Sequence, residues 1–345
     1  MEARNTAYQL YVGVDIAADT FTAAWLLSGG SPSVPFTGEQ TPTGFAALRR
    51  RLQATATPLA ETLVVLEATG NYWVALAVTL HEAGYRVAVV NPRQAHHFAK
   101  AQLRRAKTDA LDARDLAQLA AALRPAPWTP PPTVYHEARQ RLVARDALLA
   151  MRTQARNQRH ALLQWPVVVA AVRQHLDELI ADLDRRVASL DAELAAVLKE
   201  SAWAASLACL TSAPGIGLVT AAWLLVGTLN FTLCAGPESL AAYAGLAPMP
   251  RESGRSIRGR PSIGHDGNGR LRTALYMATL SAARYNPAIK AFYQRLRAAG
   301  KAPKVARCAA ARKLLHQAWA LGTKQQYFDP DHQQQQHEPL PELAA

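Results

Sequence analysis

Residues 11–27 read YVGVDIAADTFTAAWLL, and this stretch predicts two adjacent strands joined by a turn. The first half is a β-rich run that ends in an acid, Asp15, and an apolar run resumes from Phe21 to Leu27. The segment between them, up to Asp19, has the composition of a turn, which is typical of a hairpin. We therefore expect an antiparallel pair of strands over residues 9–27, with a carboxylate where the first strand ends.

Further strands follow this hairpin and alternate with helices. Two continuous apolar runs of the buried-strand type are TLVVLE at 62–67 and RVAVVN at 86–91. Helical periodicity is present in three segments, residues 43–53, 72–83 and 108–123. Thr108 is the expected N-cap of the last helix. Strands that alternate with helices predict an α/β domain over residues 1–124, in which helices cover the faces of a mixed sheet.

Four acids lie where such a domain could hold a metal ion: Asp15, Glu67, Asp109 and Asp112. Asp15 and Glu67 each end a predicted buried strand, and strand ends are where open α/β sheets place their sites. Asp109 and Asp112 share one face of a helix. Because Mg²⁺ takes hard oxygen ligands and bridges attacking and leaving oxygens in two-metal nucleases, this order of acids predicts a Mg²⁺ site.

Each of these acids, taken alone, has a simpler explanation. Glu67 could be a surface charge at a strand end, and Asp109 could be an acid favoured by the dipole of its helix. Asp115 drifts off the face that Asp109 and Asp112 share, so we expect it to be solvated or paired with an arginine. It is the joint order of the four acids that favours the metal site.

A change of composition marks the expected end of the first domain. Five prolines between residues 125 and 132 predict a stiff linker over 125–133, followed by a helical connector over 134–200. Apolar residues of the second connector helix fall at the a and d positions of a heptad: Leu176, Ile180, Leu183, Val187, Leu190, Leu194 and Val197. This seam favours a parallel two-stranded coiled coil in which Arg186 meets Asp191 of a partner. A helical hairpin within one chain remains an open alternative.

The expected second domain, residues 201–330, begins with two apolar helices joined by the turn Pro214 to Gly217. Glycines let a backbone approach a phosphate, and the next helix offers free N–H groups at its positive end. The pattern is typical of a helix-hairpin-helix that binds nucleic-acid backbone through Pro214, Gly215 and Gly217. A plain turn between helices is the alternative.

A Gly-rich basic loop is expected at about 249–270, followed by helices to about 322. Six arginines are candidates for nucleic-acid binding: Arg251, Arg255, Arg258, Arg260, Arg270 and Arg272. Their guanidinium groups can donate paired hydrogen bonds to phosphate oxygens and can stabilise charge in a transition state. A serine among them could attack a phosphodiester, but composition does not choose between Ser253, Ser256 and Ser262, nor does it exclude a passive DNA-contact loop. The tail, residues 331–345, is predicted to be disordered.

Composition narrows the class of protein. The 345 residues are half hydrophobic, enough to bury a core, and the net charge is +12. This charge favours a polyanionic partner, because each cation placed on a phosphate releases a counterion. Three scattered cysteines, at positions 209, 234 and 308, do not form a disulfide framework or a zinc motif and fit a reducing cytosol. We expect neither a signal peptide nor a membrane span.

Taken together, these stretches resemble the DEDD insertion-sequence transposases, whose better-known members use a bridge RNA. Six segments are similar to the family's motifs and follow in the family's order: 11–17 (YVGVDIA), 66–72 (LEATGNY), 107–113 (KTDALDA), 214–217 (PGIG), 244–248 (AGLAP) and 252–254 (ESG). The resemblance covers nearly the whole chain. One departure is GHDGN at 264–268, where relatives often carry a Ser-Lys-x-Gly-Asn-like stretch.

The resemblance implies an RNase H-like (RuvC-like) first domain in which the four acids coordinate Mg²⁺. It implies a serine transposase domain at the C-terminus, with Ser253 as the nucleophile and phosphodiester transesterification as the reaction. It also implies a homo-oligomer, dimer or tetramer, whose active sites are composed from two subunits. A bridge RNA would select donor and target DNA, and the protein would work in the prokaryotic cytosol near the nucleoid.

Two other interpretations have different consequences. A junction-resolving nuclease would use only the acids and water, but it leaves the serine loop unexplained. A regulator that binds nucleic acid without catalysis is disfavoured by the intact set of four acids.

Overall fold

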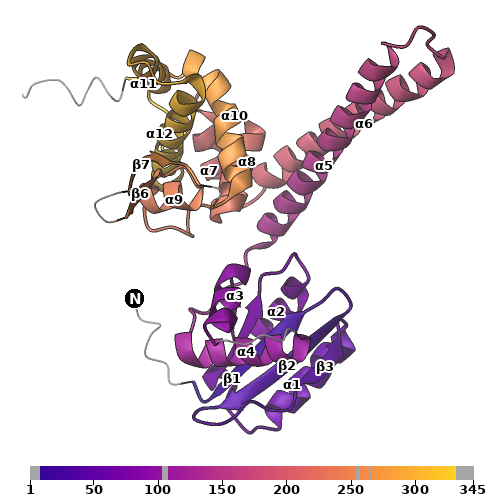
Figure 1. Cartoon of the computed structure of the whole chain (residues 1–345), viewed down its shortest axis with the longest axis vertical. Helices are drawn as coiled ribbons and strands as arrows, with labels where there is room; N and C mark the ends of the chain where they lie inside the picture. The colour runs from indigo at the N-terminus through magenta and orange to yellow at the C-terminus, as the bar shows by residue number, and fades with distance from the viewer. Residues whose placement is uncertain (1–7, 103–107, 254–256, 265, 332–345) are drawn as a thin grey trace, which may run out of the picture. The chain divides into compact units, whose positions relative to one another are not determined.

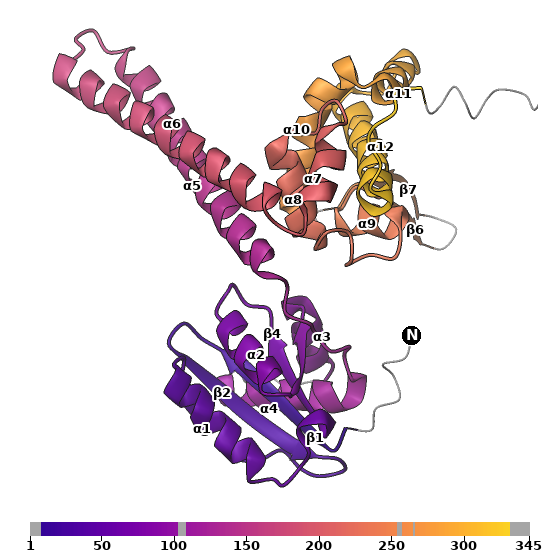
Figure 2. The ribbon, with the colours of Figure 1, turned by 180° about the vertical axis from the view of Figure 1, so that it is seen from behind.

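The structure is a computed structural model that describes residues 8–102, 108–253, 257–264 and 266–331. Contacts between Cα atoms divide the chain into two compact units, Met1–Pro130 and Pro131–Ala345. The division falls inside the proline-rich stretch, and each unit is described by itself (Figure 1, Figure 2).

The first unit is built on a five-stranded sheet with the strand order β3-β2-β1-β4-β5. Its strands are β1 (Leu10–Ile16), β2 (Thr20–Leu27), β3 (Phe36–Glu39), β4 (Thr62–Glu67) and β5 (Arg86–Val90). Its helices are α1 (Pro42–Gln53), the 3-10 turn η2 (Leu59–Glu61), α2 (Trp73–Glu82), α3 (Pro92–Ala101) and α4 (Asp109–Leu123). β2 is antiparallel to β1 and β3, whereas β1, β4 and β5 are parallel. The predicted mixed α/β sheet is confirmed, and β3 is an addition to it.

The two faces of the sheet carry separate cores, because side chains alternate along each strand. The even-numbered residues of β1, from Leu10 to Ile16, belong to the core that includes α1 and α2. Tyr11 of β1 and Val65 of β4 belong to the core that includes α4. Asp15 and Glu67 have the parity of these two residues, so both acids leave the sheet on the face that α4 covers.

The second unit is mostly helical. Its elements are α5 (Thr133–Leu162), α6 (Ala170–Lys199), α7 (Ala204–Thr211), α8 (Leu218–Thr228), α9 (Pro237–Tyr243), β6 (Met249–Ser253), β7 (Ile257–Ser262), α10 (Gly269–Tyr285), α11 (Pro287–Ala298) and α12 (Pro303–Lys324). One buried cluster joins the base of the α5–α6 pair to the remaining helices, and it includes Leu142, Leu194, Leu224, Leu275 and Leu314.

α5 and α6 pack against each other as a helical hairpin within one chain (Figure 1). The heptad residues Ile180, Leu183, Val187 and Leu194 are buried in the single chain. Asp191 is bound by Arg145 of α5 (Nε to Oδ1, 2.6 Å), and Arg186 is bound by Asp182 of its own helix. Within one chain, α5 supplies both an apolar surface and a cation to the seam, which is the helical-hairpin alternative. The pairing of Arg186 with Asp191 of a partner stays a prediction.

The stretch predicted as a Gly-rich loop at 249–270 contains a β-hairpin instead. β6 and β7 are antiparallel, with Ser253 opposite Ile257 and Arg251 opposite Gly259. The glycine content suggested a loop, but a strand tolerates a glycine where the other backbone approaches closely. α10 then begins at Gly269, inside the predicted loop.

No single helix of the described segments is both long and apolar enough to cross a membrane. α6 and α7 pass such a test only as a pair, on length and composition, and they are bent by 118° at the break between them.

Candidate functional site

The carboxyl ends of β1 and β4 bring two acids to one edge of the sheet. The strands are parallel and paired in register, with Val14 opposite Leu66. Asp15 and Glu67 are the next residues of their strands, so they follow this pair side by side. Both side chains are half-buried. Parallel pairing therefore accounts for the approach of two residues that lie far apart in the sequence.

Gly13 allows α4 to lie directly on β1. A Cβ atom at this position would come within 2.2 Å of Ala113 O and 2.2 Å of Ala117 N, both in the backbone of α4. Only a residue without a side chain permits so close a crossing. Asp109 and Asp112 occupy the first turn of α4, and Ala113 directly follows Asp112. The crossing at Gly13 thus fixes these two acids near the end of β1.

The electrostatics of Asp15 reflect this gathering of acids. Its pKa is raised to about 6, first by burial and then by the negative charges of Asp112, Asp109 and Glu67. A hydrogen bond from the Ile16 backbone N–H opposes the rise. The three other predicted acids therefore lie within electrostatic range of Asp15.

The donor set fits a divalent cation. Within the described segments, no group of three or more His, Cys, Asp or Glu side chains is already arranged to hold a metal ion. Burial and, after it, the neighbouring acids nevertheless disfavour the charged form of Asp15, and a bound cation would favour it. Oxygen-only ligands of this kind suit Mg²⁺ better than softer metals.

Several supporting contacts were not anticipated from the sequence. Thr69 Oγ1 donates a hydrogen bond to Glu67 Oε1 (2.6 Å) and restrains that carboxylate. Gln40 Nε2 donates to Ala17 O and Tyr72 O, and so ties together the loops that follow β1 and β4. The glycine in the middle of an apolar strand, at position 13, was the available signal for the helix crossing.

Two expectations about α4 can be compared with its structure. Thr108 is its N-cap, as predicted, and its Oγ1 accepts a hydrogen bond from Leu111 N–H (3.3 Å). Asp115, expected to be solvated or paired with an arginine, is only 7% exposed. The side of α4 that carries Asp115, away from Asp109 and Asp112, turns toward the core and not toward solvent, so the solvated alternative is wrong.

The turn between α7 and α8 divides its two glycines between different environments. Gly215 has a φ of 101°, and a Cβ there would lie 2.5 Å from Ala282 Cβ of α10. Gly217 is the N-cap of α8, and a Cβ there would meet nothing within 4 Å. Pro214 O accepts a hydrogen bond from Asn286 Nδ2 (3.4 Å). Packing on α10 therefore explains Gly215, whereas Gly217 leaves space beside the start of α8.

The candidate serine lies at the end of a strand. Ser253 is the last residue of β6, and the next strand begins at Ile257. Arg251 belongs to β6, and Arg258 and Arg260 belong to β7. The candidates Arg255 and Ser256 fall outside the described residues.

Two of the predicted nucleic-acid contacts are engaged with other parts of the protein. Arg270 Nη1 binds Asp146 Oδ2 (2.6 Å), and its guanidinium lies 5.3 Å from the ring centroid of Trp223. Arg272 Nη1 donates a hydrogen bond to Asp266 O (2.9 Å). These contacts join α10 to α5, α8 and the loop before α10, and they give both arginines a structural role.

Comparisons with known proteins agree over most of the chain. A transposase model, DEDD_Tnp_IS110, matches residues 12–165, and a model described as Transposase IS116/IS110/IS902 family matches residues 207–294. Pilin gene-inverting proteins of Moraxella bovis and Moraxella lacunata are each 32% identical over 324 residues, which cover 92% of this chain and 97% of the relative. An insertion element IS900 uncharacterized 42 kDa protein of Mycobacterium paratuberculosis is 31% identical over 177 residues, 51% of this chain and 43% of that protein.

Proposed function

This chain belongs to the IS116/IS110/IS902 family of transposases, and from that premise we propose that it cuts and rejoins DNA with a serine nucleophile and metal-binding acids. Family membership implies a recombinase of insertion elements. The observation that carries the finer proposal is the position of Asp15, on which Glu67, Asp109 and Asp112 all act electrostatically. Metal-binding nucleases need such a group of oxygen ligands.

Asp15, Glu67, Asp109 and Asp112 would hold Mg²⁺ at the edge of the sheet. The bound ion would polarise the scissile phosphate and orient it for attack. An RNase H-like identity for the first unit is part of this proposal. Its support is the strand order β3-β2-β1-β4-β5, with acids at the ends of β1 and β4 and in the first turn of α4.

Ser253 would perform the covalent step. Its Oγ would form a bond to the scissile phosphorus while a bond from phosphorus to a deoxyribose oxygen breaks, which releases a hydroxyl and leaves a phosphoserine link. A deoxyribose hydroxyl of the second strand would then attack this phosphorus, form the new DNA linkage and return Ser253 to its free form. Arg255 and Arg258 would stabilise the charge that develops on the phosphate oxygens.

The partners follow from the same proposal. The relatives named pilin gene-inverting proteins favour strand exchange that conserves the number of DNA linkages, as inversion requires. A bridge RNA would choose donor and target DNA by base pairing, and two subunits of a dimer or tetramer would contribute to each active site. The net charge of +12 fits contact with the phosphates of both nucleic acids.

Trapping the covalent adduct tests this function. The protein would be co-expressed with the flanks of its element, purified with any bound RNA, supplied with donor and target DNA and Mg²⁺, and denatured to reveal protein joined to DNA. We expect an adduct with the unaltered chain and none with Ser253→Ala. Ser262→Ala, a matched serine at the far end of β7, should keep it.

The other outcomes discriminate between the alternatives. Cleavage without any adduct would support a junction-resolving nuclease that uses water, and the serine mechanism would be wrong. Nucleic-acid binding without cleavage, with or without Mg²⁺, would support a regulator. An adduct that survives Ser253→Ala and disappears in Ser262→Ala would identify Ser262 of β7 as the nucleophile.

A further inference from the structure

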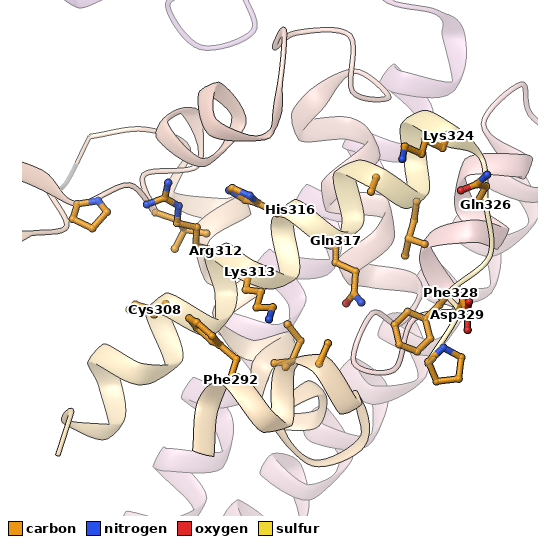
Figure 3. Close-up of a pocket in the computed structure, with 18 of the residues that line it drawn as sticks. Phe292, Cys308, Arg312, Lys313, His316, Gln317, Lys324, Gln326, Phe328 and Asp329 are labelled. Atoms are coloured by element: carbon orange, nitrogen blue, oxygen red, sulfur yellow. The ribbon is translucent and has the colours of Figure 1, made fainter. Parts of the chain in front are cut away.

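A cavity of about 1300 Å³ lies beside α12 in the second unit, and none of the residues proposed above for catalysis, metal binding or nucleic-acid binding lines it (Figure 3). Its walls come from α11, α12, the segment 326–330 and residues on both sides of the β6–β7 hairpin. The volume exceeds the range of roughly 300–1000 Å³ that is typical of small-molecule sites, so a segment of a polymer fits it better than a metabolite does.

Apolar side chains form most of the lining of this cavity, and cations predominate among its charged residues. Its cations are Lys304, Arg312, Lys313 and Lys324, and the sole acid among the described lining residues is Asp329. None of the four cations forms an ion pair with a carboxylate of the described segments. Basic residues of α12 thus lie around one cavity.

Cations are also crowded together around Phe292. Lys313 Nζ lies 5.0 Å, and Arg295 Cζ 5.3 Å, from the centroid of the same ring. Burial and Arg295 lower the pKa of Lys313, and burial and Arg312 lower that of His316, which Glu238 opposes. Burial and, after it, the nearby arginines disfavour the charged forms of these two groups, and an anionic ligand would favour them.

The walls are held in place by hydrogen bonds. Phe328 N–H donates to Ser212 Oγ (2.8 Å), which fixes the segment after α12 onto the end of α7. Asn286 Nδ2 donates to Gln317 Oε1 (2.8 Å), which joins α11 to α12. In Figure 3, Lys313 and Gln317 point from α12 toward the side where Phe292 and Phe328 lie. The adjacent Tyr327 is 68% exposed and offers an aromatic face to a ligand.

We propose that this cavity binds a single-stranded nucleic-acid segment, whose phosphates contact the lysines and whose unpaired base stacks on Tyr327. Sites for single strands combine a positively charged groove with exposed aromatic rings, and both are present here. An acidic peptide would satisfy the cations but would leave the aromatic face without a specific role. The site does not depend on the serine chemistry, so binding and recombination can fail separately.

Binding of labelled oligothymidylate and oligouridylate to the full-length protein tests the proposal, with fluorescence anisotropy at several salt concentrations. The double variant Lys313→Gln, Lys324→Gln should lower the affinity about tenfold. It should also reduce the slope of log K against log salt by about 1.4, since each phosphate contact on a single strand contributes about 0.7. Tyr327→Ala should lower the affinity about tenfold and leave the slope unchanged, because stacking releases no counterions.

Matched controls locate the site. Lys290→Gln with Lys301→Gln removes the same charge from exposed positions that do not line the cavity. Tyr285→Ala removes a second tyrosine that is also 68% exposed. The proposal is overturned if these controls reduce binding as much as the cavity variants, or if polyglutamate competes as well as the oligonucleotides. Tighter binding of oligothymidylate identifies the ligand as DNA, and tighter binding of oligouridylate identifies it as RNA.

Discussion

The acid cluster of the first unit and the serine hairpin of the second unit position their residues in different ways. The acids come from three separate segments and are held by a sheet and by a helix that crosses β1 at Gly13. Ser253 lies at the end of a two-stranded hairpin, and β6 and β7 make extensive contact only with each other among the described elements. An isolated hairpin is marginally stable, whereas a covered five-stranded sheet is rigid. The fold therefore fixes the backbone that carries the four acids, whereas the hairpin that carries Ser253 has less support from the rest of its unit.

The first prediction compares the acid cluster with the serine hairpin by the effect of one substitution in each on recombination and on stability. We expect Asp15→Asn and Ser253→Ala each to lower recombination by about a thousandfold, as removal of a key catalytic group does. Only Asp15→Asn should also stabilise the metal-free protein at neutral pH, because it removes a charge that burial and, after it, the neighbouring acids disfavour. Recombination assays and thermal unfolding at several pH values measure both effects.

The sign of the pH dependence follows from the raised pKa of Asp15. Between 3.8, its ordinary pKa, and about 6, its pKa in the fold, the folded state binds more protons than the unfolded state. Stability is therefore lost as the pH rises through this window, and the loss is complete above it. Because Asp15 is half-exposed and solvent screens it, we expect Asp15→Asn to gain about 1 kcal/mol at pH 7 and nothing at low pH. A loss of stability at pH 7 would contradict the raised pKa of Asp15.

The second prediction tests the rigid frame of the first unit. Gly13→Ala should destabilise the protein by about 3 kcal/mol, since the added methyl group meets the α4 backbone, which cannot move without repacking. The control is Gly217→Ala in the second unit, where a Cβ meets nothing within 4 Å. Chemical denaturation should show a lower midpoint for the first variant only. Equal midpoints for the two variants would mean that α4 does not need so close a crossing.

The acids were predictable because each lies at a strand or helix end that the hydrophobic pattern already marks. The end of the TLVVLE run places Glu67, and the N-cap Thr108 places Asp109 and Asp112. The close contact at Gly13 was not predicted, because a pattern of apolar residues carries no distance between a helix and a strand. The sheet partner β3 was missed for a similar reason, since FTGE has too few apolar residues to stand out.

The connector and the basic loop show what the sequence leaves undecided. The heptad seam of α6 fits either another chain or α5, and only the arginines of α5 opposite Asp184 and Asp191 decide for α5. In the basic stretch, glycine content concealed the pairing of β6 with β7. Neither feature could be derived from spacing, because both depend on a partner segment far along the chain or across a turn.

The third prediction concerns Mg²⁺, the cation that the four acids of the first unit are proposed to hold. Mg²⁺ at ten times its dissociation constant should stabilise the protein by about 1.4 kcal/mol, as binding to the folded state alone requires. The effect should be smaller below pH 6, where Asp15 is protonated and competes with the metal. Asp109→Asn should reduce the stabilisation, and Ser253→Ala should retain it in full. Thermal unfolding at matched ionic strength measures the difference, and equal stabilisation by sodium ions would contradict a specific site.

The last prediction compares two arginines of the second unit, and its effects are the smallest. Arg270 is engaged by Asp146 and Trp223, so Arg270→Gln should cost about 0.5 kcal/mol of stability and change the affinity for DNA less than twofold. Arg258 belongs to β7 beside the serine strand, so Arg258→Gln should weaken duplex binding about fivefold and lower the salt slope by about 0.9, with no change in stability. Anisotropy titrations of both variants measure the affinity for DNA and its salt slope, and unfolding curves measure their stability. If Arg270→Gln lowered the salt slope instead, the arginine at the start of α10 would bind phosphate despite its ion pair, and the hairpin would not be the main DNA contact of its unit.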